Sequence, residues 1–403
     1  MFPAAAQFSP AHATSHVSVH GDVSPGFEGV RDVFIENFSR RHELGGACCA
    51  YYRGKKVVDL WGGIRNQKTG EPWAEDTMVI IYSATKGLAA MTMALAHSRG
   101  WLDYDQRVAA YWPEFAQGSK HTITVRQLLA HQAGLFALDV PMTRELAGDF
   151  DRLARILARQ KPAWEPGTRQ AYHAITLGFY ESELLRRIDP RHRPLGEFFQ
   201  EEIATPLGLE VYIRLPEWIP DARLAVMSRP GLVRMATGFG LSMLLTFYNP
   251  GSNINRALDG SALPLDDYCI YARNLEIPSG GGVATARGIA RAYSAFAIGG
   301  ELGLTQETLD ELTAAAVPSA NGFYDECMKG EAKFSLGFMK PSDAIPFGST
   351  AASFGSPGAG GAMGFADPDM RIGYGYVTCQ MGTSLTGDPR DIALRDAIYA
   401  ACR

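Results

Sequence analysis

The order of strand-like and helical patterns along the chain is the feature that most limits its fold. Residues 46–52 and 57–61 are rich in apolar and aromatic side chains and flank the turn Arg53-Gly54-Lys55, which predicts a β-hairpin. From residue 83 to about 265 the pattern is mainly helical, and strand-like segments return at 334–339, 361–366 and 372–380. Strands at both ends with helices between them predict one sheet assembled from the two ends of the chain, with a mainly helical subdomain inserted.

The sequence predicts a single domain behind a short leader. Residues 1–23 are rich in Ala, His and Ser without periodicity, so we expect a flexible leader. Its histidines are spaced four apart without other ligand residues nearby, which favours a polar tail over a metal site: His12, His16 and His20. No linker divides residues 24–403. Within them we place a sheet-bearing part at about 24–80 and 275–403, and a helical part at about 81–274.

The composition argues against several classes of partner. A formal net charge of −5 and the lack of a long basic run argue against nucleic acid and an anionic membrane surface. None of the six cysteines forms a C-x-x-C pair, which indicates buried thiols in a reducing compartment. The first twenty-odd residues lack the features of a secretory signal, and no apolar stretch reaches membrane-spanning length. We therefore expect a cytoplasmic protein that acts on a small, uncharged or weakly polar molecule.

A serine and a lysine three residues apart are the first candidates for chemistry. Ser83-Ala-Thr-Lys86 follows the apolar run 78–82 and opens a helical pattern, which puts both side chains on one side of the first turn. The dipole at a helix start and burial both favour a neutral lysine amine, which can accept the proton of a serine hydroxyl. The alternative is a serine that only caps the helix, although a capping box would carry Glu or Gln in place of Lys86. The spacing alone leaves both interpretations open.

Other catalytic and cofactor motifs are missing from the sequence. A triad of the α/β-hydrolase type needs G-x-S-x-G and a late histidine, and neither is present, so we interpret His131 as a structural hydrogen-bonding residue. There is no H-E-x-x-H, no paired cysteine spacing, no G-x-G-x-x-G and no P-loop. Neither a metal nor a nucleotide cofactor is therefore expected. The glycine clusters 280–282 and 358–361 are predicted to permit close backbone approach around a pocket.

Several segments in a fixed order carry a family resemblance. After Ser83–Lys86 come Thr122-Ile-Thr-Val-Arg-Gln-Leu-Leu-Ala-His-Gln-Ala-Gly134-Leu135, Trp164-Glu-Pro-Gly167 before Tyr172-His173, the glycine-rich turn 278–286, and Phe354-Gly-Ser-Pro-Gly-Ala-Gly-Gly361. Together they resemble the β-lactamase-like serine hydrolases, which include class C β-lactamases, D,D-peptidases and family VIII carboxylesterases. The resemblance covers nearly all of the chain after residue 24. It implies an α/β fold of the α+β type, with an antiparallel sheet flanked by helices.

The resemblance also implies roles for particular residues. Ser83 is the expected nucleophile, Lys86 its base, and Tyr172 the residue that relays a proton to the leaving group. The backbone N–H groups of Ser83 and Ala359 are the expected oxyanion hole. No metal or organic cofactor is needed for this chemistry. Candidates for the substrate pocket are Ser356, Gly358, Trp164 and His173.

Two departures from the family pattern bear on the substrate. Many members have Tyr-x-Asn where this chain has Tyr172-His173-Ala174, and usually Lys or His where Ser356 stands. The chain thus lacks an amide that could hold the lysine and a substrate amide, and a cation that could meet a substrate carboxylate. We therefore expect a serine esterase that hydrolyses small carboxylic esters through an acyl-enzyme. The alternatives are an acyltransferase using the same acyl-enzyme, a β-lactamase- or D,D-peptidase-like amidase, and a non-catalytic binding protein.

Overall fold

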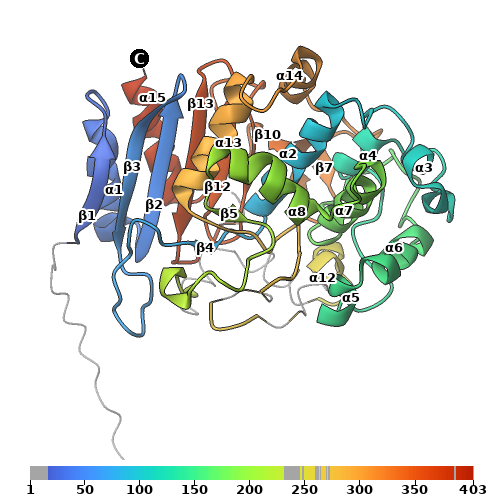
Figure 1. Cartoon of the computed structure of the whole chain (residues 1–403), viewed down its shortest axis with the longest axis horizontal. Helices are drawn as coiled ribbons and strands as arrows, with labels where there is room; N and C mark the ends of the chain where they lie inside the picture. The colour runs from blue at the N-terminus through green and yellow to red at the C-terminus, as the bar shows by residue number, and fades with distance from the viewer. Residues whose placement is uncertain are drawn as a thin grey trace, which may run out of the picture.

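A computed structural model of the chain describes residues 17–230, 246, 249–258, 263, 265–268, 270, 273–384 and 387–402. Its main feature is an eight-stranded antiparallel sheet in the order β1-β3-β2-β13-β12-β11-β10-β9. The strands are β1 (Val19–Val23), β2 (Gly45–Tyr52), β3 (Lys55–Gly63), β9 (Lys333–Ser335), β10 (Phe338–Lys340), β11 (Phe354–Pro357), β12 (Met363–Asp367) and β13 (Ile372–Thr378). The N-terminal strands lie beside the C-terminal ones (Figure 1), which confirms the predicted sheet built from both ends of the chain.

The two ends of the chain meet where β2 pairs with β13. Cys49 of β2 lies opposite Gly375 of β13 in this pairing. The predicted hairpin is confirmed, because β2 pairs with β3 across a turn at Arg53 and Gly54. The strand-like segments near the C-terminus form a second hairpin, in which β12 pairs with β13 across the turn that follows Asp367. At Arg53 and Gly54 φ is 52° and 77°, which is the left-handed conformation of a tight hairpin turn.

Strand β1 corrects the prediction of a flexible leader over residues 1–23. Its residues pair with β3 from Val19 opposite Gly62 to Val23 opposite Val58, so the prediction is wrong for 19–23. Val19 and Val23 pack against the core, while His20 and Asp22 are exposed. Only one face of this strand is covered, so its sequence contains polar residues and does not form an apolar run. His20 stacks on Trp61 with ring centroids 6.3 Å apart. The other two histidines of the predicted tail, His12 and His16, lie outside the described residues.

Helices cover both faces of the sheet (Figure 1). On one face, α1 (Glu28–Arg40) and α15 (Pro389–Ala401) bury a cluster that includes Phe34 and Leu394. On the other face, α13 (Ala286–Ile298) lies across β13, β2 and β12. Gly373 lets it approach, because a Cβ there would come within 2.2 Å of the Ser294 nitrogen. Helix α2 (Ala84–Ser98) also lies directly on the sheet, where it contacts β10, β11 and β12.

The segment between the two halves of the sheet is largely helical, as predicted. Its described helices are α3 (Val108–Tyr111), α4 (Val125–Leu129), α5 (Arg144–Gly148), α6 (Phe150–Arg159), α7 (Thr176–Ile188), α8 (Leu195–Phe199), α9 (Thr205–Leu207) and α12 (Asn253–Leu258), with the short turns η1 (Pro113–Ala116), η2 (Gln200–Ala204) and η3 (Asp221–Arg223). Helix α14 (Gln306–Thr313) follows α13. A small sheet joins β4 (Val79–Ile80), β6 (Val283–Ala284) and β5 (Val211–Tyr212), and β7 (Tyr324–Asp325) pairs with β8 (Gly330–Glu331). In the described part of the chain, no helix has the length and apolar character that crossing a membrane requires.

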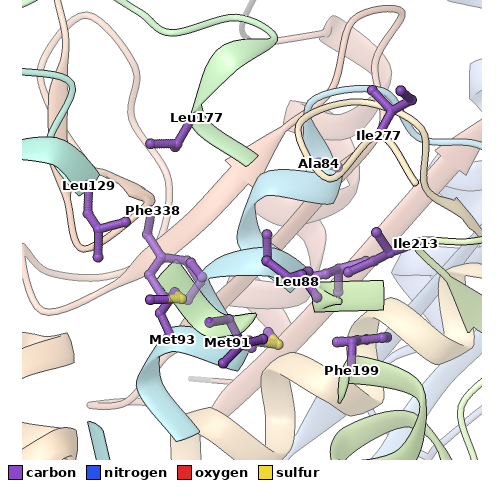
Figure 2. Packing of buried hydrophobic residues seen from close by; sticks show 14 of the residues in the cluster. Ala84, Leu88, Met91, Met93, Leu129, Leu177, Phe199, Ile213, Ile277 and Phe338 are labelled. Carbon is purple, nitrogen blue, oxygen red and sulfur yellow. The ribbon is translucent and has the colours of Figure 1, made fainter. Parts of the chain in front are cut away.

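Helix α2 lies at the centre of the larger hydrophobic core. All its residues from Ala84 to Ala96 are buried. Figure 2 shows Leu88, Met91 and Met93 among side chains from other elements, including Leu129, Leu177 and Phe338. A helix packed on all sides has little freedom to shift, because core side chains fill the space at close-packed density. The N-terminus of α2 is therefore held firmly between the sheet and the helical part.

Candidate active site

Ser83 stands at the N-terminus of α2, as the sequence predicts. Tyr82 precedes it with φ of 44°, a conformation that costs energy for a non-glycine residue and turns the chain from β4 into the helix. The side chain of Ser83 makes no capping hydrogen bond to its own helix, and the residue is half-buried. A serine present only as a cap would bond the backbone N–H of the first turn. The capping alternative is therefore wrong, and the hydroxyl is available to other groups.

Lys86 lies in the first turn of α2 and is buried, with 2% of its surface exposed. Its Nζ is 3.4 Å from Ser83 Oγ, and it donates hydrogen bonds to the carbonyl oxygens of Ala174 at 2.6 Å and Ser279 at 2.8 Å. Burial lowers the pKa of Lys86 to about 7, although the carboxyl of Glu181 acts in the opposite direction. An amine with such a pKa is largely unprotonated just above neutrality, which is the form a general base needs.

Tyr172 completes the cluster from the segment before α7. Its hydroxyl donates to Ser83 Oγ at 2.8 Å, and Lys86 Nζ lies 4.7 Å from the centre of its ring. Phe334 stacks on Tyr172, with the two ring centroids 5.7 Å apart. Burial raises the pKa of Tyr172 above its usual value, and the hydrogen bond to Ser83 only partly opposes this. The Tyr172 hydroxyl therefore keeps its proton near neutral pH.

The end of β11 comes close to Ser83, and the loop that follows it approaches the residues just before Ser83. Ser356 is 5% exposed and its hydroxyl donates to the Ser83 carbonyl oxygen at 2.7 Å. At Gly358 a Cβ would come within 2.1 Å of the Ile81 carbonyl oxygen, so only glycine permits this approach, which confirms that part of the prediction. Within the described residues, neither the N–H of Ser83 nor that of Ala359 donates to an acceptor. Both expected oxyanion donors are thus unengaged at the place where the loop meets the helix.

His173 does not line the substrate pocket, contrary to the prediction. It is fully buried, its Nε2 accepts from the Leu135 N–H at 3.2 Å, and its Nδ1 donates to the Ala171 carbonyl at 2.7 Å. Both ring nitrogens are therefore occupied inside the protein, and burial lowers its pKa to about 4. The side chain follows Tyr172 in the chain but points into the core, so it cannot touch a substrate.

The structure confirms the predicted role of His131 and leaves that of Trp164 untested. His131 is fully buried and its Nδ1 accepts from the His173 N–H at 3.0 Å, which confirms a structural hydrogen-bonding role. Trp164 is half-buried and stacks on Phe136 at 5.3 Å, in a cluster that Tyr172 borders. A part for Trp164 in substrate binding stays a prediction.

The sequence does not reveal the groups that hold Lys86. The Ala174 carbonyl does part of what the missing Asn amide could have done, and the Ser279 carbonyl comes from the glycine-rich turn. That turn reaches α2 through Gly282, where a Cβ would lie 2.6 Å from Thr85 Oγ1. The glycine cluster 280–282 is the one feature of the sequence that points to these contacts. It indicates that the backbone there approaches another segment closely, but it does not identify that segment. Among the described residues, no group of three or more His, Cys, Asp and Glu side chains is placed to hold a metal ion.

Comparison with known proteins bears on the class of this site. The family model described as Beta-lactamase matches residues 30–397. The Esterase/beta-lactamase LipL of Mycobacterium tuberculosis is 32% identical over 372 residues, which cover 89% of this chain and 82% of LipL. A crystal structure of a family VIII carboxylesterase has a TM-score of 0.83 at 34% identity and covers 95% of this chain and 100% of its own. A penicillin-binding protein homologue from Caulobacter crescentus has a TM-score of 0.82 at 34% identity, with the same coverage of 95% and 100%.

The fold and these relatives define an enzyme of the serine hydrolase class. The match over residues 30–397 goes one step further, and the chain belongs to the Beta-lactamase family. This membership confirms the family resemblance and the fold that the ordered sequence motifs imply.

Proposed function

We propose that this serine hydrolase is a carboxylesterase that cleaves small esters through an acyl-enzyme on Ser83. The observation that carries the proposal is the cluster around one hydroxyl: Tyr172 Oη donates to Ser83 Oγ at 2.8 Å, and Lys86 Nζ lies 3.4 Å from the same atom. A serine with a base and a proton donor within reach is the arrangement that nucleophilic catalysis requires. The esterase names of LipL and of the family VIII carboxylesterase support the same activity.

Acylation uses groups of the chain at every step. Ser83 Oγ attacks the ester carbonyl carbon while its proton passes to the neutral amine of Lys86. The carbonyl oxygen becomes negative, and the N–H groups of Ser83 and Ala359 stabilise that charge. When the carbon–oxygen bond to the alcohol breaks, Tyr172 gives its proton to the departing oxygen and receives the proton held by Lys86.

Deacylation reverses the same relay. Water attacks the acyl carbon, and its proton passes through Tyr172 to Lys86 as the new carbon–oxygen bond forms. The oxyanion then collapses, the bond to Ser83 Oγ breaks, and the serine recovers a proton while the acid leaves. Because the pKa of Tyr172 is raised, its proton moves together with a second proton rather than leaving first.

The substrate class follows from what Ala174 and Ser356 offer. Ala174 contributes only its backbone carbonyl, which is already bonded to Lys86. The Ser356 hydroxyl is bonded to the Ser83 carbonyl and carries no charge. A β-lactam amide and carboxylate would therefore lack partners here, and the loss of a charge-assisted contact costs about 1.5–3 kcal/mol, or roughly ten- to a hundredfold in transition-state binding. A small uncharged ester has neither an amide nor a carboxylate, so its binding requires neither contact.

The test compares two substrate classes on wild-type enzyme and on Ser83→Ala. We expect ready turnover of p-nitrophenyl acetate to butyrate, slow or undetectable hydrolysis of a chromogenic cephalosporin, and a loss of ester turnover by several orders of magnitude in Ser83→Ala. A fluorophosphonate should label the wild type and not the variant. If kcat/KM for the cephalosporin equals that of the best ester, the enzyme is a β-lactamase. Adding an alcohol acceptor and analysing the products separates hydrolysis from acyl transfer.

The cysteines support the proposed cytoplasmic location. Cys48, Cys49, Cys327, Cys379 and Cys402 are free thiols, and the first four are buried. Free buried thiols fit a reducing compartment, where disulfides do not persist.

A further inference from the structure

The turn that carries Ala359 has few restraints of its own. It joins β11 to β12, and the Gly361 N–H donates across it to the Gly358 carbonyl at 3.1 Å. Gly360 and Gly361 follow Ala359 with φ of 93° and 118°, conformations that favour glycine. Two consecutive glycines have wide conformational freedom, so contacts from outside the turn must fix the direction of the Ala359 N–H.

One arginine side chain is hydrogen-bonded to this turn. Arg390 lies in the first turn of α15 and is 2% exposed. Its Nη2 donates to the Gly360 carbonyl at 3.2 Å, and the Gly382 N–H donates to the same oxygen at 2.9 Å. Among the described residues, no other side chain is hydrogen-bonded to residues 358–361.

The remaining donors of Arg390 fix the orientation of its guanidinium. Its Nε and Nη2 form a fork on the Asp388 carboxylate, at 2.8 Å and 2.7 Å. Its Nη1 donates to Thr378 Oγ1 at 3.1 Å and to Glu43 Oε1 at 3.4 Å. These partners come from the start of α15, the end of β13 and the segment after α1. Every N–H of the guanidinium is therefore engaged, and the side chain is held in one orientation.

The ion pair also touches the turn through Gly361. A Cβ on Gly361 would lie 2.9 Å from Asp388 Oδ2 and 3.1 Å from Arg390 Nη2. On its other side the turn meets the segment just before Ser83, through Gly358. The turn is therefore held between that segment and the pair of Asp388 and Arg390.

We propose that Arg390 is a positioning residue for the reaction: through its hydrogen bond to Gly360, and held by Asp388, it keeps the Ala359 N–H directed at the developing oxyanion. The proposal rests on the proposed function, in which Ala359 is an oxyanion donor. Such donors are effective because they are fixed before the charge develops and do not have to reorganise. Without Arg390, a turn with two glycines would have to be ordered during the reaction itself.

The test compares Arg390→Lys with the wild type. A lysine keeps the positive charge, but its compact amine cannot reach Asp388, Glu43 and Gly360 together. We expect kcat/KM for p-nitrophenyl butyrate, per active site counted by fluorophosphonate labelling, to fall about ten- to a hundredfold. The inhibition constant of butylboronic acid should rise by a similar factor, because its adduct with Ser83 is a negatively charged tetrahedron that needs the same donors.

Arg395→Lys is the matched control on the same helix. Arg395 is 7% exposed, its Nε donates to Asp391 Oδ2 at 2.8 Å, and its Nη1 donates to the Pro346 carbonyl at 2.9 Å. It thus has the same kinds of partner as Arg390, and in the described structure none of its hydrogen-bond partners belongs to residues 358–361. The control should lose thermal stability to a similar degree, but keep the wild-type rate and boronic acid affinity per active site.

Asp388→Asn tests the same contact from the other partner. It removes one of the two carboxyl groups around Arg390 and weakens the fork that orients the guanidinium, while asparagine still caps α15. We expect kcat/KM per active site to fall several-fold, with a matching rise in the inhibition constant of butylboronic acid. If Arg390→Lys does not fold, this variant alone decides. The acid limb of the pH profile, which reports the titration of Lys86, should stay at its wild-type position in both variants.

The outcomes separate this inference from the proposed function. If the wild type cleaves esters and both Arg390→Lys and Asp388→Asn match it per active site, the inference fails and the proposed function stands. An equal loss in Arg395→Lys, or an acid limb that moves, also overturns the inference. If the wild type cleaves no ester but binds butylboronic acid, and Arg390→Lys weakens that binding, the proposed activity fails and the inference stands.

Discussion

Two of the three buried lysines among the described residues, Lys86 and Lys120, differ in the groups that face the amine. Lys120 lies after η1 and is fully buried. Its amine donates hydrogen bonds to the carbonyl oxygens of Gln117 at 2.8 Å, Ala158 at 2.8 Å and Gln160 at 2.7 Å. Lys86 donates to two carbonyls, and its third neighbour is the Ser83 hydroxyl at 3.4 Å. Burial lowers the pKa of both, to about 8 and about 7 respectively.

The difference shows that burial alone does not make a base. Carbonyl oxygens only accept hydrogen bonds, so a neutral Lys120 would point its lone pair at an acceptor. A hydroxyl can donate, so a neutral Lys86 keeps three satisfied contacts and can receive the serine proton. Lys120 therefore ties together three backbone segments, and Lys86 is suited to proton transfer.

The largest expected effect is the loss of catalytic rate when Lys86 is replaced. Lys86→Arg should be nearly as inactive as Lys86→Ala, with kcat lowered by roughly a thousandfold or more, because a guanidinium stays protonated. Steady-state kinetics with a short-chain ester measures this, and circular dichroism checks the fold. An arginine variant with most of the wild-type activity would make Lys86 a fixed cation, and the contrast with Lys120 would collapse.

Lys120→Ala is the matched control for that experiment. It leaves three buried carbonyls without their donor, so the free energy of unfolding should fall by about 2–4 kcal/mol. The rate per folded molecule should stay close to wild type. Denaturant unfolding and active-site titration measure the two quantities on one preparation.

The next effect in size is the dependence of the rate on pH. The proposed role of Lys86 as the base requires a neutral amine, and a pKa of about 7 means that the amine gains a proton as the pH falls below that value. We expect kcat/KM to fall about tenfold for each pH unit below the midpoint, which follows from the fraction of neutral amine. The Lys120→Ala variant should show the same acid limb. A limb that moved in this variant would mean that Lys120 also influences the base.

The smallest effect concerns the contact between β11 and the nucleophile. Ser356→Ala removes the hydrogen bond to the Ser83 carbonyl, and a neutral hydrogen bond is worth about 0.5–1.5 kcal/mol, so kcat/KM should fall by up to about tenfold. Ser353 on the same segment has a buried hydroxyl without a partner among the described residues. Ser353→Ala should therefore change the rate very little. Equal losses in the two variants would show that the loop, rather than this bond, matters.

The strands that sequence patterns predicted are apolar and largely buried runs. Strands β2, β3, β12 and β13 are of this kind, and the turn residues Arg53 and Gly54 mark the hairpin of β2 and β3. Strand β1 was missed because only its alternate residues Val19 and Val23 are covered, and the residues between them are polar. A short edge strand of this kind looks like a tail until its partner is known.

The site was predictable where residue identity carries the chemistry. Ser83 and Lys86 are close in sequence, and Tyr172 was found through the resemblance to a family, although 89 positions separate it from Ser83. The carbonyls of Ala174 and Ser279 could not be found, because every residue has one. Arg390 carries no signal either, since an arginine in a helix usually faces solvent.

The pairing of β2 with β13 also determines when, during synthesis, the site can form. Ser83, Lys86 and Tyr172 leave the ribosome well before residues 354–378, which supply Ala359 and the strand that covers the open edge of β2. Until then the N-terminal strands have an unpaired edge, and pairing between distant segments is slow. A nascent chain therefore holds the serine and its lysine without Ala359, the second of the two proposed oxyanion donors. Under the proposed mechanism, hydrolysis is expected only after the last strands dock.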